Sequence, residues 1–303
     1  MDKESKTIFR KYAGRRKKVL LCGVAVFVFL AGAYAMDWPL EQGVLIANFG
    51  ENQGGTPILG TTFAAEGMVA ASDAGEVIFR QNGFNDASRL PGPLGAWVAL
   101  DHGEGLIGVY GRFDPSDSLE IPYIAEKGGA LARTGRSGWS ETEGFYFSLF
   151  DRKEQRWVNP TMIITPLPDT RAPVIQSVLL KTAEERVIDP SQVQRIGQGR
   201  YTITVTVIDT HTSPADNPLA PYRIICIVNG AEIGNLTFET ISARDGALMV
   251  YRNGLVPVSQ VYAPSPGFEV GEAWFNRGQA ILEIIALDKN ENAHSVQYRL
   301  QVE

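Results

Sequence analysis

Apolar and polar residues alternate along much of the chain with the two-residue period of β-strands. The alternation runs through segments 67–80, 95–113 and 144–160, and again through 200–209, 222–230 and 278–302. Short turn signals separate the apolar stretches, for example Gly103-Glu104-Gly105, Asn229-Gly230 and the Asx-rich stretch 288–292. Such alternation between Gly- and Asx-rich turns is typical of antiparallel sheets. The pattern predicts an all-β protein with hairpins at 95–113, 144–160 and 278–302.

The first 35 residues follow a different pattern. Eight Lys and Arg residues precede the apolar run 19–35, which ends in Ala33-Tyr34-Ala35. A basic start, an apolar run shorter than the roughly 20 residues of a spanning helix and a small-x-small end are typical of a secretory signal peptide. We therefore predict that residues 1–35 direct export to the periplasm or cell envelope. The alternative is an uncleaved anchor, which would be the only membrane contact of the protein.

Charge and cysteine content narrow the function further. The net charge is −6, and without residues 1–35, which carry eight basic and two acidic residues, it becomes −12. An acidic chain without a basic tract argues against nucleic acid as a partner. Cys226 is the only cysteine after residue 35, so an intramolecular disulfide is excluded.

A Pro-rich stretch divides the remaining chain. Residues 164–173 read ITPLPDTRAP, and proline stiffens a chain and removes backbone donors. We predict a first domain at 36–165, a linker at 166–173 and a second domain at 174–303.

The first domain resembles a known family. The segments VAASDAGEV, VALDHGEGLIGVYGRF, GGALARTGRSGWSETEGFYFSL and RWVNP occur in the chain in this order. In order and spacing they resemble the β-sheet domain of the lysostaphin/LytM-type zinc endopeptidases, which cleave peptidoglycan cross-bridges. The resemblance covers about residues 43–165 and implies a LytM-type antiparallel β-sheet domain.

The resemblance also implies where a zinc site would lie. In that family a His and an Asp of a first segment and the second His of a His-x-His hold the metal. These positions fall at Ile58, at Thr62 and, for the His-x-His, at Gly144 and Tyr146; a further His, which stabilises the transition state, falls at Arg112. A catalytic zinc needs three protein ligands such as His, Cys or carboxylates. We therefore predict no metal, no cofactor and no catalytic residue, that is, a pseudoenzyme.

The same positions can still bind a partner. Arg112 could hold a carboxylate by paired hydrogen bonds, and Tyr146 with Trp139 and Phe145 could stack on sugar or peptide. The alternative is that Tyr146 and Phe145 fill the space of the lost metal as extra core. One further group, namely Arg133, Arg136 and Trp139, is a candidate binding edge for an acidic partner or an ordinary solvated turn.

Three histidines remain to be interpreted. His102 could be a lone metal ligand or general base, but we favour the turn-proximal His of an HG.G hairpin, which is not a zinc ligand in the family. His211 and His294 are interpreted as surface or loop residues.

The second domain shows no pattern of catalytic residues. Its last stretch resembles the terminal hairpin of immunoglobulin-like or fibronectin-III-like sandwiches, with Glu291 at the usual Gly position. A Ca²⁺ site from Asp288 and Asn290 is one interpretation of its turn, and a plain Asx turn is the favoured one. We expect a C-terminal Ig-like β-sandwich that spaces or binds.

These features favour a non-catalytic LytM-like envelope protein. Its expected partner is peptidoglycan or a cell-wall hydrolase, because members of the family without metal act as amidase regulators or envelope-binding modules. An active peptidoglycan metalloendopeptidase and a purely structural envelope protein are the alternatives.

Overall fold

The computed structural model describes residues 36–40, 42–81, 92–117, 122–140, 142–211, 218–263 and 267–303. The predicted signal segment 1–35 lies outside the described residues. Residues 37–303 form one compact unit. In the part of the chain that is described, no helix is long and apolar enough to cross a membrane.

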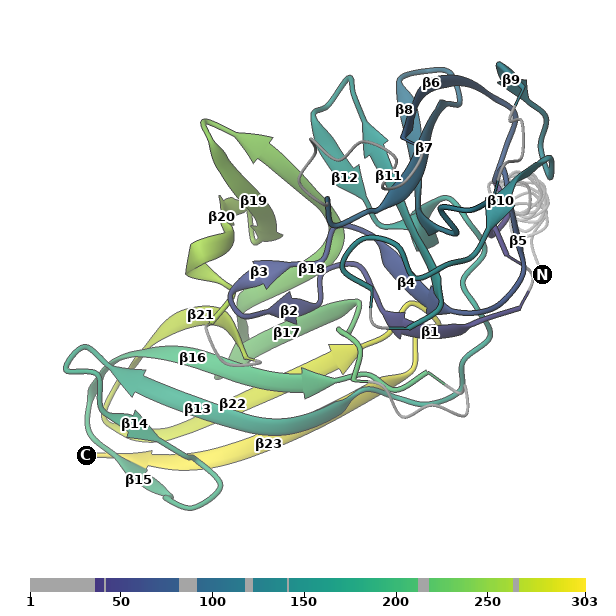
Figure 1. Ribbon diagram of the computed structural model, residues 1–303. Coiled ribbons are helices and arrows are strands. Elements are labelled where there is room, and N and C mark those ends of the chain that lie inside the picture. Colours follow the sequence, from purple (N-terminus) through teal and green to yellow (C-terminus); the bar gives the residue numbers. More distant parts are fainter. Residues whose placement is uncertain are drawn as a thin grey trace, which may run out of the picture. The chain divides into compact units, whose positions relative to one another are not determined.

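The all-β prediction is confirmed, because strands dominate the described chain and the helical elements in it are short 3-10 turns (Figure 1). The strands of the first half are β1 (Val44–Ala47), β2 (Asn52–Gln53), β3 (Thr56–Pro57), β4 (Thr61–Ala64), β5 (Met68–Ala70), β6 (Gly75–Gln81), β7 (Ala96–Asp101), β8 (Leu106–Phe113), β9 (Ile124–Ala125), β10 (Ala130–Arg133), β11 (Gly144–Asp151) and β12 (Arg156–Val158). The 3-10 turn η1 (Pro160–Met162) follows.

The second half continues with strands of greater length. They are β13 (Val174–Thr182), β14 (Val187–Ile188), β15 (Arg195–Ile196), β16 (Gly199–Ile208), β17 (Arg223–Val228), β18 (Ala231–Arg244), β19 (Ala247–Arg252), β20 (Leu255–Pro257), β21 (Phe268–Phe275), β22 (Gly278–Leu287) and β23 (Ala293–Val302). The 3-10 turn η2 (Val258–Gln260) lies between β20 and β21.

The three predicted hairpins are present. Strands β7 and β8, β11 and β12, and β22 and β23 each pair antiparallel with their neighbour in sequence. The turn before β18 follows the prediction too, because Asn229 and Gly230 have φ of 51° and 80°. Two successive left-handed residues are what a two-residue hairpin turn of type I′ requires.

Strand β16 shows how the sequence pattern produces the layers of the second half. Its apolar residues Tyr201, Ile203, Val205 and Val207 are buried, whereas the threonines between them are only partly buried. Alternate side chains of a strand point to opposite faces, so one face of β16 packs into a hydrophobic core.

Two facing sheets enclose that core. One has the order β14-β13-β16-β21, and β23, β22, β17 and β18 belong to the other. Figure 1 shows β13 and β16 lying over β22 and β23, and buried residues of both sheets form one cluster. This arrangement is a β-sandwich, and its immunoglobulin-like character remains a prediction.

One continuous sheet passes from the first half into the second. Its order is β15-β23-β22-β17-β18-β12-β11-β8-β7-β6-β9. The two halves meet where β12 pairs antiparallel with β18, placing Trp157 opposite Ile241. Next to this pair, the side-chain amide of Asn159 donates to the carbonyl of Phe238 at 2.9 Å.

A second contact joins the halves through the segment before β2. Phe49 is 1% exposed and belongs to the core cluster of the sandwich. The Asn48 side chain forms two hydrogen bonds with the backbone of Ala220, each of 2.8 Å. The Tyr262 hydroxyl donates to the carbonyl of Gly50 at 2.9 Å. The first half thus supplies part of the core of the second, and the predicted domain boundary at 166–173 remains a proposal.

Candidate functional site

Strands β4, β11 and β8 bring three of the predicted site residues together. Tyr146 on β11 lies opposite Thr62 on β4, and on its other side opposite Gly111 on β8. Arg112 follows Gly111, so its side chain starts from the strand next to Tyr146. The pairing of β4 with β11 and of β11 with β8 therefore gathers Thr62, Arg112 and Tyr146 at one place in the sheet.

Arg112 occupies a bulge between β7 and β8. Ala96 pairs with Phe113 and Trp97 pairs with Gly111, which leaves Arg112 as the extra residue. Its backbone is left-handed, with φ of 67°, and its N–H donates to the carbonyl of Leu94 at 2.7 Å. A bulge redirects the side chain of the extra residue, and here it directs an arginine toward β11.

The Arg112 side chain is only partly satisfied by the protein. Its guanidinium carbon lies 5.9 Å from the centre of the Tyr146 ring, within cation–π distance. Its Nε is buried and has no hydrogen-bond partner among the described residues. Burial lowers the pKa of Arg112, while the nearby Tyr146 raises it. Because an arginine remains charged in proteins, this position holds a fixed positive charge with an unused donor.

Tyr146 fills space that a larger residue at position 60 would occupy. A methyl group built on Gly60 would lie 2.6 Å from the Tyr146 hydroxyl and 2.4 Å from the Phe147 carbonyl oxygen. Burial raises the pKa of Tyr146, and a hydrogen bond with Ser148 and the charge of Arg112 oppose the rise. The phenol is therefore neutral at physiological pH. Only glycine at position 60 leaves room for the Tyr146 hydroxyl.

The neighbours of Tyr146 on the same strand are core residues. Phe145 is 1% exposed and stacks on Phe63 with 5.1 Å between ring centres. At Gly144 a methyl group would lie 2.0 Å from the carbonyl oxygen of Phe63, so the β4–β11 approach leaves room only for glycine. Ile58 lies outside β4, in the segment between β3 and β4, where its backbone hydrogen-bonds with Gly50 and Glu51.

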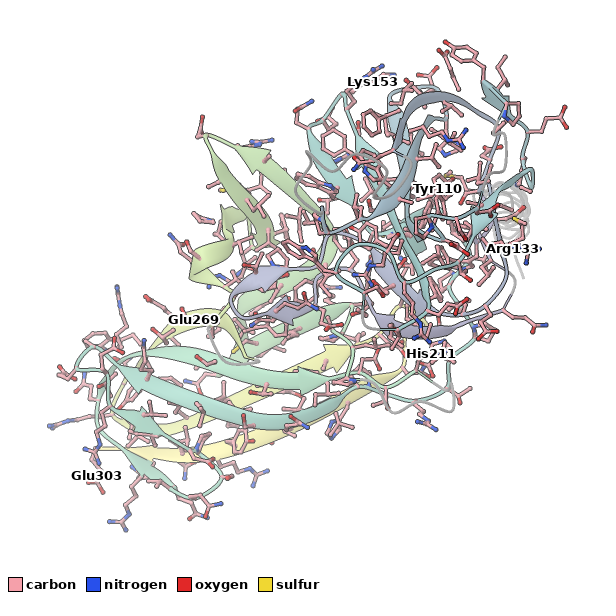
Figure 2. All side chains as sticks on the ribbon, viewed as in Figure 1. Tyr110, Arg133, Lys153, His211, Glu269 and Glu303 are labelled. Carbon is pink, nitrogen blue, oxygen red and sulfur yellow. The ribbon has the colours of Figure 1, made fainter. Side chains whose placement is uncertain are left out.

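The candidate edge residues are exposed. Trp139 is 71% exposed, and its backbone N–H donates to the carbonyl of Pro93 at 3.3 Å. The side chains of Arg133, on β10, and Arg136 also point into solvent, and Arg133 is labelled in Figure 2. The backbone N–H of Arg133 donates to Asp117 at 2.7 Å.

His102 is held by structural contacts. Its Nδ1 lies 3.0 Å from the carbonyl oxygen of Ala74, and its Nε2 lies 3.1 Å from the hydroxyl of Tyr110. Tyr110 is fully buried, and its hydroxyl accepts a hydrogen bond of 3.0 Å from the Ser72 N–H. Figure 2 shows Tyr110 among the strands of the first half. His102 thus links the β7–β8 turn to the segment before β6, which supports the structural interpretation.

The other two histidines belong to the second half. The Nδ1 of His294 accepts a hydrogen bond of 3.3 Å from the Ile175 N–H. His211, labelled in Figure 2, lines a cavity that reaches Thr61 on β4.

The turn at 288–292 has the geometry of the favoured interpretation. Asp288 Oδ1 accepts a hydrogen bond of 2.9 Å from the Asn292 N–H, and Asp288 Oδ2 accepts one of 2.7 Å from the Asn292 side chain. The side chain of Asn290 donates to the carbonyls of Leu167 and Asp169. The Asn290 side chain thus holds the turn against the Pro-rich segment.

The chain is similar to several solved structures of known proteins. The chain is similar to a putative M23 peptidase from Pseudomonas aeruginosa, with 24% identity over 39% of this chain and 46% of that chain and a TM-score of 0.30. It is similar to the catalytic domain of the M23 protein EnpA from Enterococcus faecalis, with 23% identity over 43% of this chain and 97% of that chain and a TM-score of 0.34. It is also similar to lysostaphin, with 13% identity over 89% of this chain and 98% of that chain and a TM-score of 0.35.

Other comparisons add less. A protein-family model without a descriptive name matches residues 172–303. No curated protein is similar enough in sequence to match. The chain spans 46% of the length of the Pseudomonas aeruginosa protein. The chain is thus similar to M23 peptidases and lysostaphin in structure, and the roles of its residues rest on its own side chains.

Proposed function

We propose that this protein is a non-catalytic, LytM-like protein of the cell envelope that binds peptidoglycan. The observation that carries the proposal is the group formed by Thr62, Arg112 and Tyr146. By the sequence resemblance, these residues correspond to two zinc ligands and a transition-state histidine of the family. Strand pairing of β4, β11 and β8 brings them to one place, which supports the proposal.

The chemistry of this group does not fit a zinc ion. Zinc is bound by imidazole, thiolate or carboxylate, and Thr62 offers only a hydroxyl. Tyr146 is a neutral phenol, because burial raises its pKa. The guanidinium of Arg112 adds a positive charge 5.9 Å from the Tyr146 ring, which repels a second cation. We therefore derive no hydrolytic step at this site.

The same group suits recognition of a peptide carboxylate. Arg112 is partly exposed and lies in a bulge, and among the described residues its buried Nε has no partner and its guanidinium forms no ion pair. A guanidinium pairs with a carboxylate through two parallel hydrogen bonds. Trp139, 71% exposed, offers a flat apolar face for a sugar ring. Peptidoglycan presents both chemistries, and export through the predicted signal segment would place the protein beside it.

The first experiment separates binding from cleavage. The chain from residue 36 onward is incubated with purified sacculi, and pelleted protein and released amino termini are measured. We expect co-sedimentation, no new amino termini, and zinc well below one ion per chain by elemental analysis. Chelator-sensitive release of amino termini would overturn the proposal. Stimulation of a separate hydrolase without co-sedimentation would also overturn it, in favour of a regulator.

The second experiment tests the role of Arg112. Arg112→Ala should weaken sacculus binding by about 1.5–3 kcal/mol, the contribution of a hydrogen bond to a charged group. Arg299→Ala, which removes an exposed arginine on β23, should leave binding unchanged. Both variants should keep the unfolding midpoint of the parent protein. Equal binding by the two variants would show that the group around Arg112 is not the binding site.

A further inference from the structure

Three carboxylates from distant parts of the chain meet in the second half. Asp169 lies in the Pro-rich segment before β13, Asp209 directly follows β16, and Asp288 directly follows β22. One carboxylate oxygen of each lies within 4.8 Å of the others. Asp209 is 7% exposed and Asp288 is 5% exposed, so two of the three are almost fully buried.

The three carboxylates line a cavity rather than a closed core. The cavity has a volume of about 80 Å³ and is also lined by His211, Asn48 and Tyr222. A water molecule needs roughly 10–15 Å³ of such space, so there is room for an ion together with several waters.

Two of the three carboxylates, Asp209 and Asp288, form no ion pair with Lys or Arg among the residues that the structure describes. Lys289 lines the cavity, but its Nζ lies over the ring of Tyr222, 4.3 Å from the ring centre, and contacts the Tyr222 hydroxyl. Burial, followed by the charges of Asp288 and Asp169, raises the pKa of Asp209 to about 7. Negative charge at this place is therefore costly without a counter-ion.

Asp209 provides an independent sign of a missing ligand. Its Oδ1 is buried and has no hydrogen-bond partner in the part of the chain that the structure describes. Asp288 differs, because both of its oxygens accept hydrogen bonds from Asn292. Native proteins satisfy nearly all buried polar atoms, and an orphaned carboxylate oxygen beside two further carboxylates needs an explanation. A cation bound by Asp209 supplies one.

The donor set favours calcium among the common cations. Carboxylates are hard oxygen ligands, which suit Ca²⁺ and Mg²⁺ better than zinc or copper. Ca²⁺ binds oxygen at about 2.3–2.6 Å, so two ligands on opposite sides of the ion are roughly 4.6–5.2 Å apart. Mg²⁺ binds at about 2.0–2.1 Å and would require all three oxygens within roughly 4.2 Å. Oxygens within 4.8 Å of one another can reach one Ca²⁺ ion, whose longer bonds and flexible geometry tolerate wider separations than those of Mg²⁺.

We propose that Asp169, Asp209 and Asp288 bind one Ca²⁺ ion, with waters in the cavity completing its coordination. The ion ties the Pro-rich segment to the ends of β16 and β22, and so fixes the chain where the first half leads into the sandwich. This proposal is independent of peptidoglycan binding and concerns a different set of residues.

The test uses the purified protein, stripped with chelator and dialysed at pH 8. Titration with CaCl₂ by calorimetry should show one ion per chain, and CaCl₂ should raise the melting temperature. Asp209→Asn should weaken Ca²⁺ binding at least about tenfold, because it removes one charged ligand. A tenfold change in affinity corresponds to roughly 1.4 kcal/mol of binding free energy. Asp245→Asn, which changes an exposed carboxylate in the β18–β19 turn, should bind Ca²⁺ like the parent protein.

The outcomes separate the proposal from a structural role of Asp209. Removing a charge from the cluster should not lower the melting temperature of the stripped protein, so a stable Asp209→Asn variant without a Ca²⁺ response supports the site. If that variant does not fold, Asp169→Asn, whose carboxylate is more accessible, takes its place with the same expectation. Absence of Ca²⁺ binding in the parent protein, or parent-like binding by the Asn variants, would overturn the proposal. MgCl₂ serves as a second ligand and should bind more weakly; equal or tighter binding of Mg²⁺ would overturn the choice of calcium.

Discussion

Arg112 combines an unusual backbone with an unusual environment. A left-handed φ of 67° is uncommon for a residue with a long side chain. The bulge that imposes it also brings the guanidinium over the Tyr146 ring. Strained backbone conformations are often found at binding sites, because the strain positions a side chain that would otherwise point elsewhere. At the scale of single residues, this pair is the strongest candidate for recognition.

Substitution of Tyr146 tests whether its side chain is core or lines a binding groove beside Arg112. Its hydroxyl rests on Gly60 and its ring lies under Arg112. Tyr146→Ala removes a partly buried ring and should cost about 3–4 kcal/mol of unfolding free energy, the lower part of the range for large aromatic truncations. Tyr146→Phe keeps the ring and should cost only about 1 kcal/mol. Urea denaturation of both variants measures the difference.

The outcome decides between the two interpretations of Tyr146. A large loss of stability with unchanged sacculus binding would mean that Tyr146 is core filler and that ligand contacts lie elsewhere. A loss of binding with a stability change below about 1 kcal/mol would mean that it lines a binding groove.

At the scale of elements, local patterns predicted the hairpins well. The β7–β8 hairpin follows from alternation on both sides of Gly103-Glu104-Gly105, and the left-handed φ values at all three residues explain the glycines. In the β22–β23 turn, Glu291 has φ of 67° at the position where glycine was expected by resemblance. These features are readable because their causes lie within a few residues of each other.

Long-range pairing was not readable in the same way. Strands β12 and β18 are about 80 residues apart, and the register that sets Trp157 opposite Ile241 leaves no local signal. The candidate site could be predicted from the family resemblance, which indicated that Thr62, Arg112 and Tyr146 belong together. The carboxylate cluster could be predicted only in part from the sequence. Asp288 is recognised as a candidate ligand in its turn, whereas Asp169 and Asp209 come from other elements that only the fold brings close.

The turn before β2 carries a prediction about pH. Burial raises the pKa of Glu51 from 4.5 to about 7, and a hydrogen bond from the Asn48 N–H opposes the rise. A folded-state pKa above the unfolded one means that folding is favoured at low pH. The contribution of Glu51 to stability should therefore be lost as the pH rises from about 4.5 to about 7, and should stay constant above that range.

Glu51→Gln isolates this effect. The amide keeps an acceptor for the Asn48 N–H and cannot ionise, so the variant should match the parent protein at pH 4. At pH 8 it should be more stable by about 2 kcal/mol, after a discount for the partial exposure of the side chain. Urea midpoints of both proteins between pH 4 and pH 8 give the difference. A constant difference across that range would show that Glu51 does not titrate as described.

At the scale of the whole molecule, the first half of the described chain contributes to the core of the second half, although the sequence predicted two domains. Buried Phe49 belongs to the sandwich cluster, and the sheet continues from β12 into β18. Residues 37–303 also form one compact unit. A stiff linker at 166–173 and a shared core have different consequences for unfolding, because domains joined only by a linker unfold separately.

Phe49→Ala tests the shared core. The change removes a ring that is 1% exposed and should cost about 3–5 kcal/mol of unfolding free energy. Because the ring comes from the first half and packs in the second, calorimetry should show one transition in the parent protein, shifted as a whole in the variant. Phe79→Ala is the matched control, because Phe79 is 43% exposed on β6 and loses mainly its stacking on Trp97, worth about 1 kcal/mol. Two separate transitions, of which Phe49→Ala moves only one, would show that the halves fold independently and that the boundary at 166–173 is a true domain boundary.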